Sequence, residues 1–309
     1  PLSLPAHQAV GSPKGSLSVG ADGAASYSIP IDLPKGTAGM EPKLSLDYSS
    51  RGGNGLLGLG WSLGGLQTIT RGPSTFARDG QFDPADFDAN DRFFLNGQRL
   101  VCVGGGYGNP GSVYRTEIDS YARITAHGVG PSHWTVETKS GLKMTFGNSP
   151  DSRLSSPKGA MAWSVNEVQD TVGNYYTVNY HGAGEYGGFD EASHRVASIH
   201  YTGNTNAGTA PYIAVVFSYE DRPDIARAFS DNYGRLASKR LSKITVSTNG
   251  RINHSYRLGY VTSYQSGRSL LSAVTKHIDD SSSPALTVPA TTFTYDGIRP
   301  EEALWQNPG

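Results

Sequence analysis

The chain has 309 residues, a formal net charge of −1, and only 17% charged side chains. Its 26 basic and 27 acidic residues nearly balance, which argues against an electrostatic interface with nucleic acid or an acidic membrane surface. A single cysteine excludes a disulfide scaffold, and no apolar run approaches the roughly 18 residues of a membrane-spanning helix. The 39 glycines and 17 tyrosines are typical of a β-rich protein with many turns.

Residues 1–15 show no apolar periodicity, which predicts a flexible N-terminal tail. Apolar and polar residues then alternate over 16–19 and 25–33, which predicts two strands joined by an Asp-Gly turn at 22–23. A third strand is predicted over 43–48.

A glycine-rich segment follows at 54–65, where five glycines are interleaved with four leucines and a tryptophan. Interior glycines each cost a helix about 1 kcal/mol relative to alanine, and the leucines are too apolar for a solvated linker. We therefore expect a tightly packed structural corner, whose key residues are Gly55, Gly58, Gly60, Trp61 and Gly64.

An acidic segment at 72–92 predicts a long loop that contains the hard oxygen ligands calcium prefers. The spacing is not that of an EF-hand, so a solvated loop whose carboxylates cap turns is the competing interpretation. No other cofactor is expected. The candidate calcium ligands are Asp79, Asp83, Asp86, Asp88, Asn90 and Asp91.

The remaining chain reads as short strands up to residue 295. Asn96-Gly97 is the strongest hairpin signal, between predicted strands within 92–103. Only 221–237 is compatible with a helical turn or two, and its Asp and Arg residues predict surface ion pairs. The fold class is therefore all-β, with many short antiparallel strands and hairpins in twisted, curved sheets and little helix.

Three segments, 163–180, 240–260 and 270–295, share a loose pattern of strand, polar turn, and strand ending in an aromatic residue. The first has the form of a tyrosine-aspartate repeat, in which hairpins add edge to edge. Its marker residues are Asp170, Gly173, Asn174 and Tyr180.

Two catalytic patterns occur, and the surrounding sequence argues against both. Gly60-Trp-Ser62-Leu-Gly64 fits G-x-S-x-G, but glycines deny Ser62 the following helix that a nucleophile elbow requires. G-x-G-x-x-G at 53–58 likewise precedes no helix that could bind a phosphate. The eight histidines are scattered without zinc-ligand spacing.

The segment from Gly20 to Ser50 is very similar to the opening of the SpvB/TcaC N-terminal domain family. The resemblance continues through Gly60–Gly64, Ile69–Arg71, Asp91–Phe93 and Gly97–Leu100, and covers about residues 15–297. It implies a β-sheet module that, in Tc toxin complexes, forms part of a hollow cocoon enclosing a toxic C-terminal enzyme. The family's catalytic residues lie in other domains and have no counterpart in this sequence.

These observations predict a non-enzymatic structural module of a secreted bacterial toxin-type protein. The predicted division is a tail at 1–15, one SpvB-like domain at 16–297, and an exit linker at 298–309 toward a further domain. Expected partners are neighbouring domains or subunits of a toxin complex, with no nucleic acid and no membrane span. The alternative is a carbohydrate- or host-surface-binding module, assisted by calcium at the acidic loop.

Overall fold

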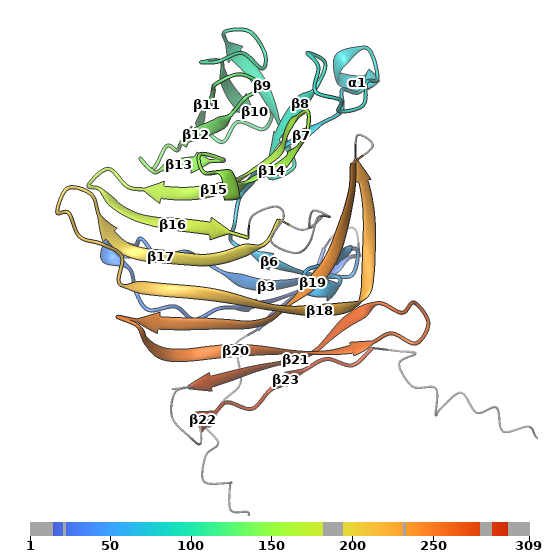
Figure 1. The fold of residues 1–309 in the computed structure, drawn as a ribbon, viewed down its shortest axis with the longest axis vertical. Helices are drawn as coiled ribbons and strands as arrows, with labels where there is room; N and C mark the ends of the chain where they lie inside the picture. Colours follow the sequence, from blue (N-terminus) through green and yellow to red (C-terminus); the bar gives the residue numbers. More distant parts are fainter. Residues whose placement is uncertain (1–14, 21–22, 182–193, 231–232, 279–285, 296–309) are drawn as a thin grey trace, which may run out of the picture.

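The structure is a computed structural model that describes residues 15–20, 23–181, 194–230, 233–278 and 286–295. These residues form a small N-terminal sheet, a closed barrel and a long open sheet (Figure 1). All strand pairs are antiparallel, and the all-β prediction is confirmed. The predicted turn residue Asp22, most of the predicted tail and the predicted exit linker lie outside the described residues.

The N-terminal sheet has four strands in the order β1-β2-β3-β6. Across its middle runs one row of side chains on a single face, because Leu17 pairs with Tyr27, Tyr27 with Tyr48, and Tyr48 with Trp61. The 3₁₀ turn η1 (Thr37–Gly39) precedes the third strand. The four strands are β1 (Ser16–Val19), β2 (Ala25–Pro30), β3 (Ser45–Ser49) and β6 (Trp61–Gly64).

The barrel closes because its eight strands pair in a cycle, the last of them returning to the first. Large aromatic side chains fill its interior, among them Phe93, Tyr114, Trp134 and Trp163, all at most 2% exposed. The strands are β7 (Thr68–Gly72), β8 (Arg92–Leu95), β9 (Gln98–Gly104), β10 (Val113–Thr116), β11 (Arg123–His127), β12 (His133–Glu137), β13 (Lys143–Phe146) and β15 (Gly159–Gln169).

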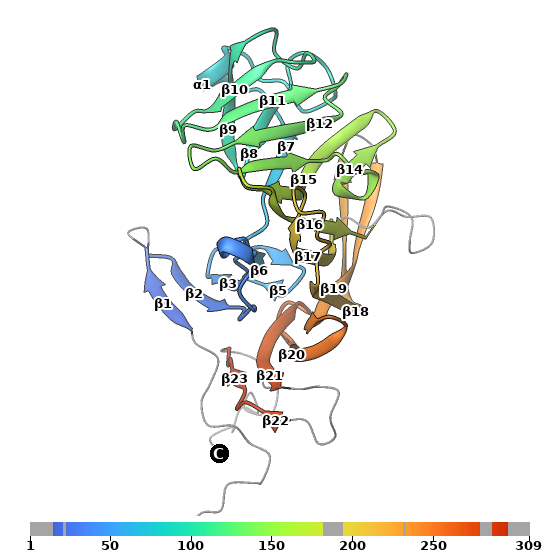
Figure 2. The same cartoon turned by 90° about the vertical axis from the view of Figure 1, so that its left-hand side faces the viewer.

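Strand β15 connects the barrel to the open sheet. Its first half pairs with β7 and with β14 (Arg153–Ser156), which follows the 3₁₀ turn η2 (Pro150–Ser152). Its second half pairs with β13 on one side and with β16 (Asn174–Tyr180) on the other. One long strand therefore belongs to both sheets, which gives the barrel a fixed position at the end of the open sheet (Figures 1 and 2).

The open sheet continues from β16 in chain order, each strand antiparallel to the one before it. It ends in two short strands that both pair with β21. Figure 2 shows the N-terminal sheet lying against this open sheet. The strands are β17 (Val196–Asn204), β18 (Ile213–Ser230), β19 (Tyr233–Thr248), β20 (Arg251–Thr262), β21 (Ser269–Ile278), β22 (Leu286–Thr287) and β23 (Thr291–Thr292).

The helical prediction for 221–237 is wrong. The described residues of that segment belong to β18 and β19, which pair from Ile213 to Ser230 with a register shift after Asp221. Pairing of the two strands in a hairpin therefore overrides the polar local sequence. The one α-helix among the described residues, α1 (Phe76–Asp79), lies instead in the predicted acidic loop. The hairpin predicted at Asn96-Gly97 is confirmed between β8 and β9, and both residues have positive φ.

Candidate functional site

The glycine-rich corner is ordered and packed. Asn54–Gly55 (β4) pairs with Gly58–Leu59 (β5), and the chain then enters β6. Leu57 is fully buried and Trp61 is 2% exposed, so the corner places its large side chains in the core. The predicted residues Gly55 and Gly64 lie at its two ends, in β4 and β6.

Gly58 and Gly60 occupy positions that only glycine fits. Both have φ near +80°, a conformation that costs other residues about 1–2 kcal/mol. A Cβ on Gly58 would lie 2.4 Å from the carbonyl oxygen of Ser269, and one on Gly60 would lie 2.6 Å from the Tyr48 ring. The corner thus passes directly against the backbone of β21.

Trp61 links the corner to the end of the open sheet. Its indole N–H donates to the hydroxyl of Tyr295 at 3.0 Å, and that hydroxyl donates to the carbonyl of Leu271 at 2.8 Å. The Trp61 ring also packs on Phe293, with ring centroids 4.8 Å apart. These contacts join the corner to residues of the open sheet that lie more than two hundred positions later in the sequence.

A buried ion pair holds the other side of the corner. Arg222 and Asp224 are 1% and 5% exposed at their side chains, with Nη2 and Oδ2 2.9 Å apart. Arg222 also donates to the Asn54 side chain at 2.7 Å and to the Gly55 carbonyl at 3.1 Å. Asp224 accepts from the amide and the hydroxyl of Ser269. The prediction of surface ion pairs is therefore wrong for Arg222 and Asp224, because the corner covers them.

Burial would raise the pKa of Asp224, but hydrogen bonds from Arg222, Ser269 and Asn54 outweigh it and hold that pKa far below its ordinary value. The carboxylate is therefore ionised at neutral pH. Asp221 lies outside this buried cluster: its side chain is 85% exposed and pairs with Lys239 at the surface.

Ser62 has no catalytic partner among the described residues. It lines a cavity of about 260 Å³ together with His194, but its hydroxyl donates to the Asp47 carbonyl at 3.4 Å. The two ring nitrogens of His194 are engaged elsewhere, with the Ser164 hydroxyl at 3.0 Å and the Asp151 carbonyl at 2.6 Å. Ser62 lies on an antiparallel strand and not at a strand-to-helix turn, so the nucleophile-elbow geometry is absent here.

The predicted repeat markers form a closed turn between β15 and β16. The Asp170 carboxylate accepts hydrogen bonds from the amides of Val172 and Asn174 and from the Asn174 side chain, at 2.8–3.0 Å. Gly173 supplies the positive φ of the turn. Burial would raise the pKa of Asp170, and these hydrogen bonds lower it overall.

Tyr180 is one of four tyrosines that use their hydroxyls in the same way. In each case the tyrosine lies three residues beyond the last paired residue of one strand. It donates to the backbone carbonyl two residues before the first paired residue of the other strand, which closes the base of the hairpin. Burial raises the pKa of each phenol, so the hydroxyl keeps its proton and remains a donor. The pairs are Tyr180 with Val165, Tyr219 with Val196, Tyr260 with Leu241 and Tyr295 with Leu271, at 2.5–2.8 Å.

The acidic loop divides into a structural part and a carboxylate cluster. Asp79 pairs with Arg99 and Arg92, which lower its pKa far below the ordinary value although burial opposes them. Asp91 is 2% exposed and pairs with Arg71. These two predicted calcium ligands are therefore used in ion pairs. Among the others, the side chain of Asn90 donates to Asp88 at 3.2 Å.

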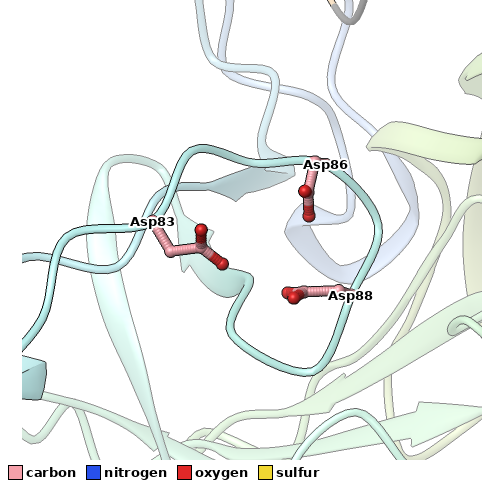
Figure 3. A group of neighbouring side chains, drawn as sticks. All are labelled: Asp83, Asp86 and Asp88. Carbon is pink, nitrogen blue, oxygen red and sulfur yellow. The ribbon is translucent and has the colours of Figure 1, made fainter.

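The remaining three aspartates come together. Figure 3 shows Asp83, Asp86 and Asp88 directing their carboxylates toward one point inside the loop. One oxygen of each lies within 4.8 Å of the others. Asp86 and Asp88 are exposed, whereas Oδ2 of Asp83 is buried and has no hydrogen-bond partner among the described residues. Of the six predicted residues, these three are the ones the structure places in a geometry compatible with a cation.

Comparisons with known proteins identify relatives of this chain. A family model described as the Salmonella virulence plasmid 65kDa B protein, SpvB, matches residues 19–101. The mono(ADP-ribosyl)transferase SpvB of Salmonella choleraesuis strain SC-B67 is 25% identical over 278 residues, and that of Salmonella typhimurium strain 14028s is 26% identical over 271. The solved N-terminal domain of SpvB from Salmonella typhimurium strain LT2 superposes with a TM-score of 0.62 and 18% identity, covering 86% of this chain and 99% of the domain.

The resemblance to the SpvB family is confirmed.

The alignment covers 73% of this chain but only 45% of the length of these SpvB relatives. The fold is also shared with larger assemblies. In the crystal structure of TcdB2-TccC3, the match has a TM-score of 0.74 and 19% identity, and covers 96% of this chain and 17% of the other. The Photorhabdus luminescens Tc holotoxin pore gives a TM-score of 0.75 at 18% identity.

The SpvB-like segment 19–101 contains the glycine corner, the acidic loop and the Arg71–Asp91 pair. The Arg222–Asp224 pair and the four tyrosine hydrogen bonds lie beyond it, in the open sheet. None of the helices described is long and apolar enough to cross a membrane.

Proposed function

We propose that this SpvB-like chain is a non-catalytic structural module of a secreted toxin-type protein, and that its curved sheets form part of a shell around a toxic domain. Its physical task is to hold a continuous antiparallel wall in one shape. The barrel, the glycine corner and the tyrosine hydrogen bonds fix that shape, and neighbouring domains or subunits extend it.

The observation that carries this proposal is the unfinished edge of the open sheet. Strand β21 is paired along most of its length with β20, but on its other side only through the short strands β22 and β23. Among the described residues, β22 and β23 pair with β21 alone, so their outer side is unpaired. An unpaired edge of this kind is a template for another strand. The TcdB2-TccC3 and holotoxin-pore matches support the same interpretation, because there this fold is a small part of a large assembly.

Hydrogen exchange tests the proposal. The reporting amides are those of Thr287 and Thr292, because Val288 and Phe293 bond to β21 and the alternating pattern points Thr287 and Thr292 to the open side. Their exchange is compared in the 309-residue chain and in a longer polypeptide that contains it. We expect them to exchange several-fold more slowly in the longer protein, because neighbouring strands cover that edge. Equal rates in both proteins would contradict a shell that continues from β23.

A second measurement separates structure from catalysis. The curated relatives are named as mono(ADP-ribosyl)transferases, and this chain covers less than half of their length. We propose that any such activity lies outside the 309 residues. The purified chain should transfer no labelled ADP-ribose from NAD to protein in a host-cell extract, and transfer that persists in the purified chain would overturn the non-catalytic assignment.

Calcium-assisted binding of a carbohydrate or host surface is the second candidate. The cluster of Asp83, Asp86 and Asp88, with the unpartnered oxygen of Asp83, favours it. A glycan array probed with calcium and with a chelator tests this candidate, and Asp83→Asn is the matched variant. Binding that requires calcium and is lost in Asp83→Asn would support it, whereas no binding in either condition would remove it.

A further inference from the structure

The N-terminal sheet has an open edge at β1. Within the described residues, β1 pairs with β2 alone. The amide of Gly20 donates to the carbonyl of Ala24, so in the alternating antiparallel pattern Ser16 and Ser18 bond to β2. The N–H and C=O groups of Leu17 and Val19 therefore point away from the sheet and are available to another strand.

The β1 edge lacks the features that usually prevent an edge strand from pairing with another chain. The described residues 15–20 include no charged side chain and no proline, and the β1–β2 register has no bulge. Leu17 and Val19 are 73% and 69% exposed, and both lie on the aromatic face of the sheet. Leu17 is the open end of the row that continues through Tyr27 and Tyr48 to Trp61.

A groove of about 440 Å³ lies beside this end of the row. It is lined by the row Leu17, Tyr27, Tyr48 and Trp61 of the N-terminal sheet and by residues 291–295. Tyrosine is the only ionisable side chain among the lining residues, so a neutral and mainly apolar occupant fits best. An uncharged strand with alternating apolar residues has the required chemistry, and β1 itself is such a strand.

We propose that β1 pairs with the β1 of a second copy of this chain, antiparallel across a twofold axis. The register that pairs Leu17 with the partner's Val19 allows both the backbone pairing and the side-chain packing of such a contact. It joins the outward-facing backbone groups in hydrogen-bonded pairs and keeps all the apolar side chains on the aromatic face. It also places Ser18 on the axis, opposite the partner's Ser18, and a self-complementary contact of this kind is what a twofold dimer requires.

The size of the contact sets its strength. Two four-residue strands and one end of a groove bury much less than the roughly 1,200 Å² of a standard stable interface. The dimer is therefore weak and forms at high protein concentration. This inference concerns the β1 edge and does not depend on the proposed shell function, which concerns the edge at β23.

Crosslinking at the axis tests the register. Ser18 would form a non-hydrogen-bonded pair, in which Cα atoms lie about 4.5 Å apart, within the range that a disulfide bridges. Ser18→Cys is made with Cys102→Ser, which removes the natural cysteine. Ser62→Cys in the same background is the control, because Ser62 is exposed on the same face but on the strand at the opposite side of the sheet. Under mild oxidation, Ser18→Cys should give several-fold more disulfide dimer than Ser62→Cys.

A charge on the edge should separate the copies. Leu17→Lys, added to Ser18→Cys, should reduce the crosslink to the Ser62→Cys level and abolish the concentration-dependent rise in sedimentation coefficient. Circular dichroism confirms that the variant is folded, and Val19→Lys replaces it if Leu17→Lys is not. Equal crosslinking of Ser18→Cys and Ser62→Cys would overturn the proposal. A dimer that survives both lysine substitutions would also overturn it, since its interface would then lie elsewhere.

Discussion

Arg71 and Asp91 form an ion pair inside the protein, with Nη1 and Oδ2 2.5 Å apart and side chains 5% and 1% exposed. Arg71 also lies over the rings of Phe87, Phe93 and Trp163, at 4.8–5.8 Å from their centroids. The pair joins the first barrel strand to the end of the acidic loop.

The same two side chains reach further segments. Arg71 donates to the carbonyls of Ala160 and Gly130, and Asp91 accepts the amides of Asp86 and Phe87. The sequence motifs Ile69–Arg71 and Asp91–Phe93, which carry part of the family resemblance, thus meet at one buried contact. The pair holds the acidic loop against the barrel.

Breaking this pair should destabilise the protein. Arg71→Met leaves the Asp91 carboxylate buried without its cation, and such a loss costs about 3–5 kcal/mol. Chemical denaturation measures the free energy of unfolding. As control, Lys35→Met removes the pair with Glu41, in which Lys35 is 89% exposed, and should cost less than about 1 kcal/mol. Equal losses in the two variants would show that the Arg71 pair is no more important than a surface contact.

Gly58→Ala should destabilise the protein more than the same substitution at a positive-φ glycine whose added Cβ meets no neighbouring atom. The new Cβ would meet the Ser269 carbonyl, so the cost of a shifted backbone, about 1–3 kcal/mol, adds to that of the positive φ. Gly80→Ala is the matched control, because Gly80 has φ of +72° and nothing within 4 Å of the added Cβ. If thermal unfolding shifts equally in both variants, the close approach to β21 is not important.

The tyrosine hydrogen bonds at the hairpin bases should each contribute to stability. Tyr260→Phe removes the donor to the Leu241 carbonyl and leaves that acceptor unpaired, at a cost of about 1–3 kcal/mol. Tyr264→Phe, at a residue that is 70% exposed, should change the free energy of unfolding by less than about 0.5 kcal/mol. If Tyr260→Phe leaves the free energy of unfolding unchanged, ring packing alone closes these hairpins.

Acid should weaken the buried ion pair of Arg222 and Asp224. The folded-state pKa of Asp224 lies below the ordinary value of 3.8, so the stabilisation is complete above about pH 4 and is lost as the pH falls toward the folded pKa. Asp224→Asn should lower stability at neutral pH and make the acid limb of the stability profile shallower. Asp221→Asn, at an exposed carboxylate, is the control and should cost less than about 1 kcal/mol at neutral pH. An acid limb that is identical in wild type and Asp224→Asn would contradict the lowered pKa.

Local patterns in the sequence determined the strands and their turns. Alternation identified β1, β2 and β3 of the N-terminal sheet, and Asn96-Gly97 identified the β8–β9 hairpin because those residues readily adopt positive φ. The density of glycine and apolar residues indicated the packed corner, and Asp170 to Asn174 indicated a turn. These features depend on neighbours within a few residues, which sequence displays directly.

Tertiary structure alone decided which distant segments meet. The return of β15 to β7 closes a barrel that no local pattern indicates, since the two strands are about ninety residues apart. The same holds for Arg222 and Asp224, whose polar sequence is typical of a surface until Asn54 and Ser269 cover them. Burial and long-range strand pairing depend on the whole chain, and they determine whether a charged or polar residue is solvated or part of the core.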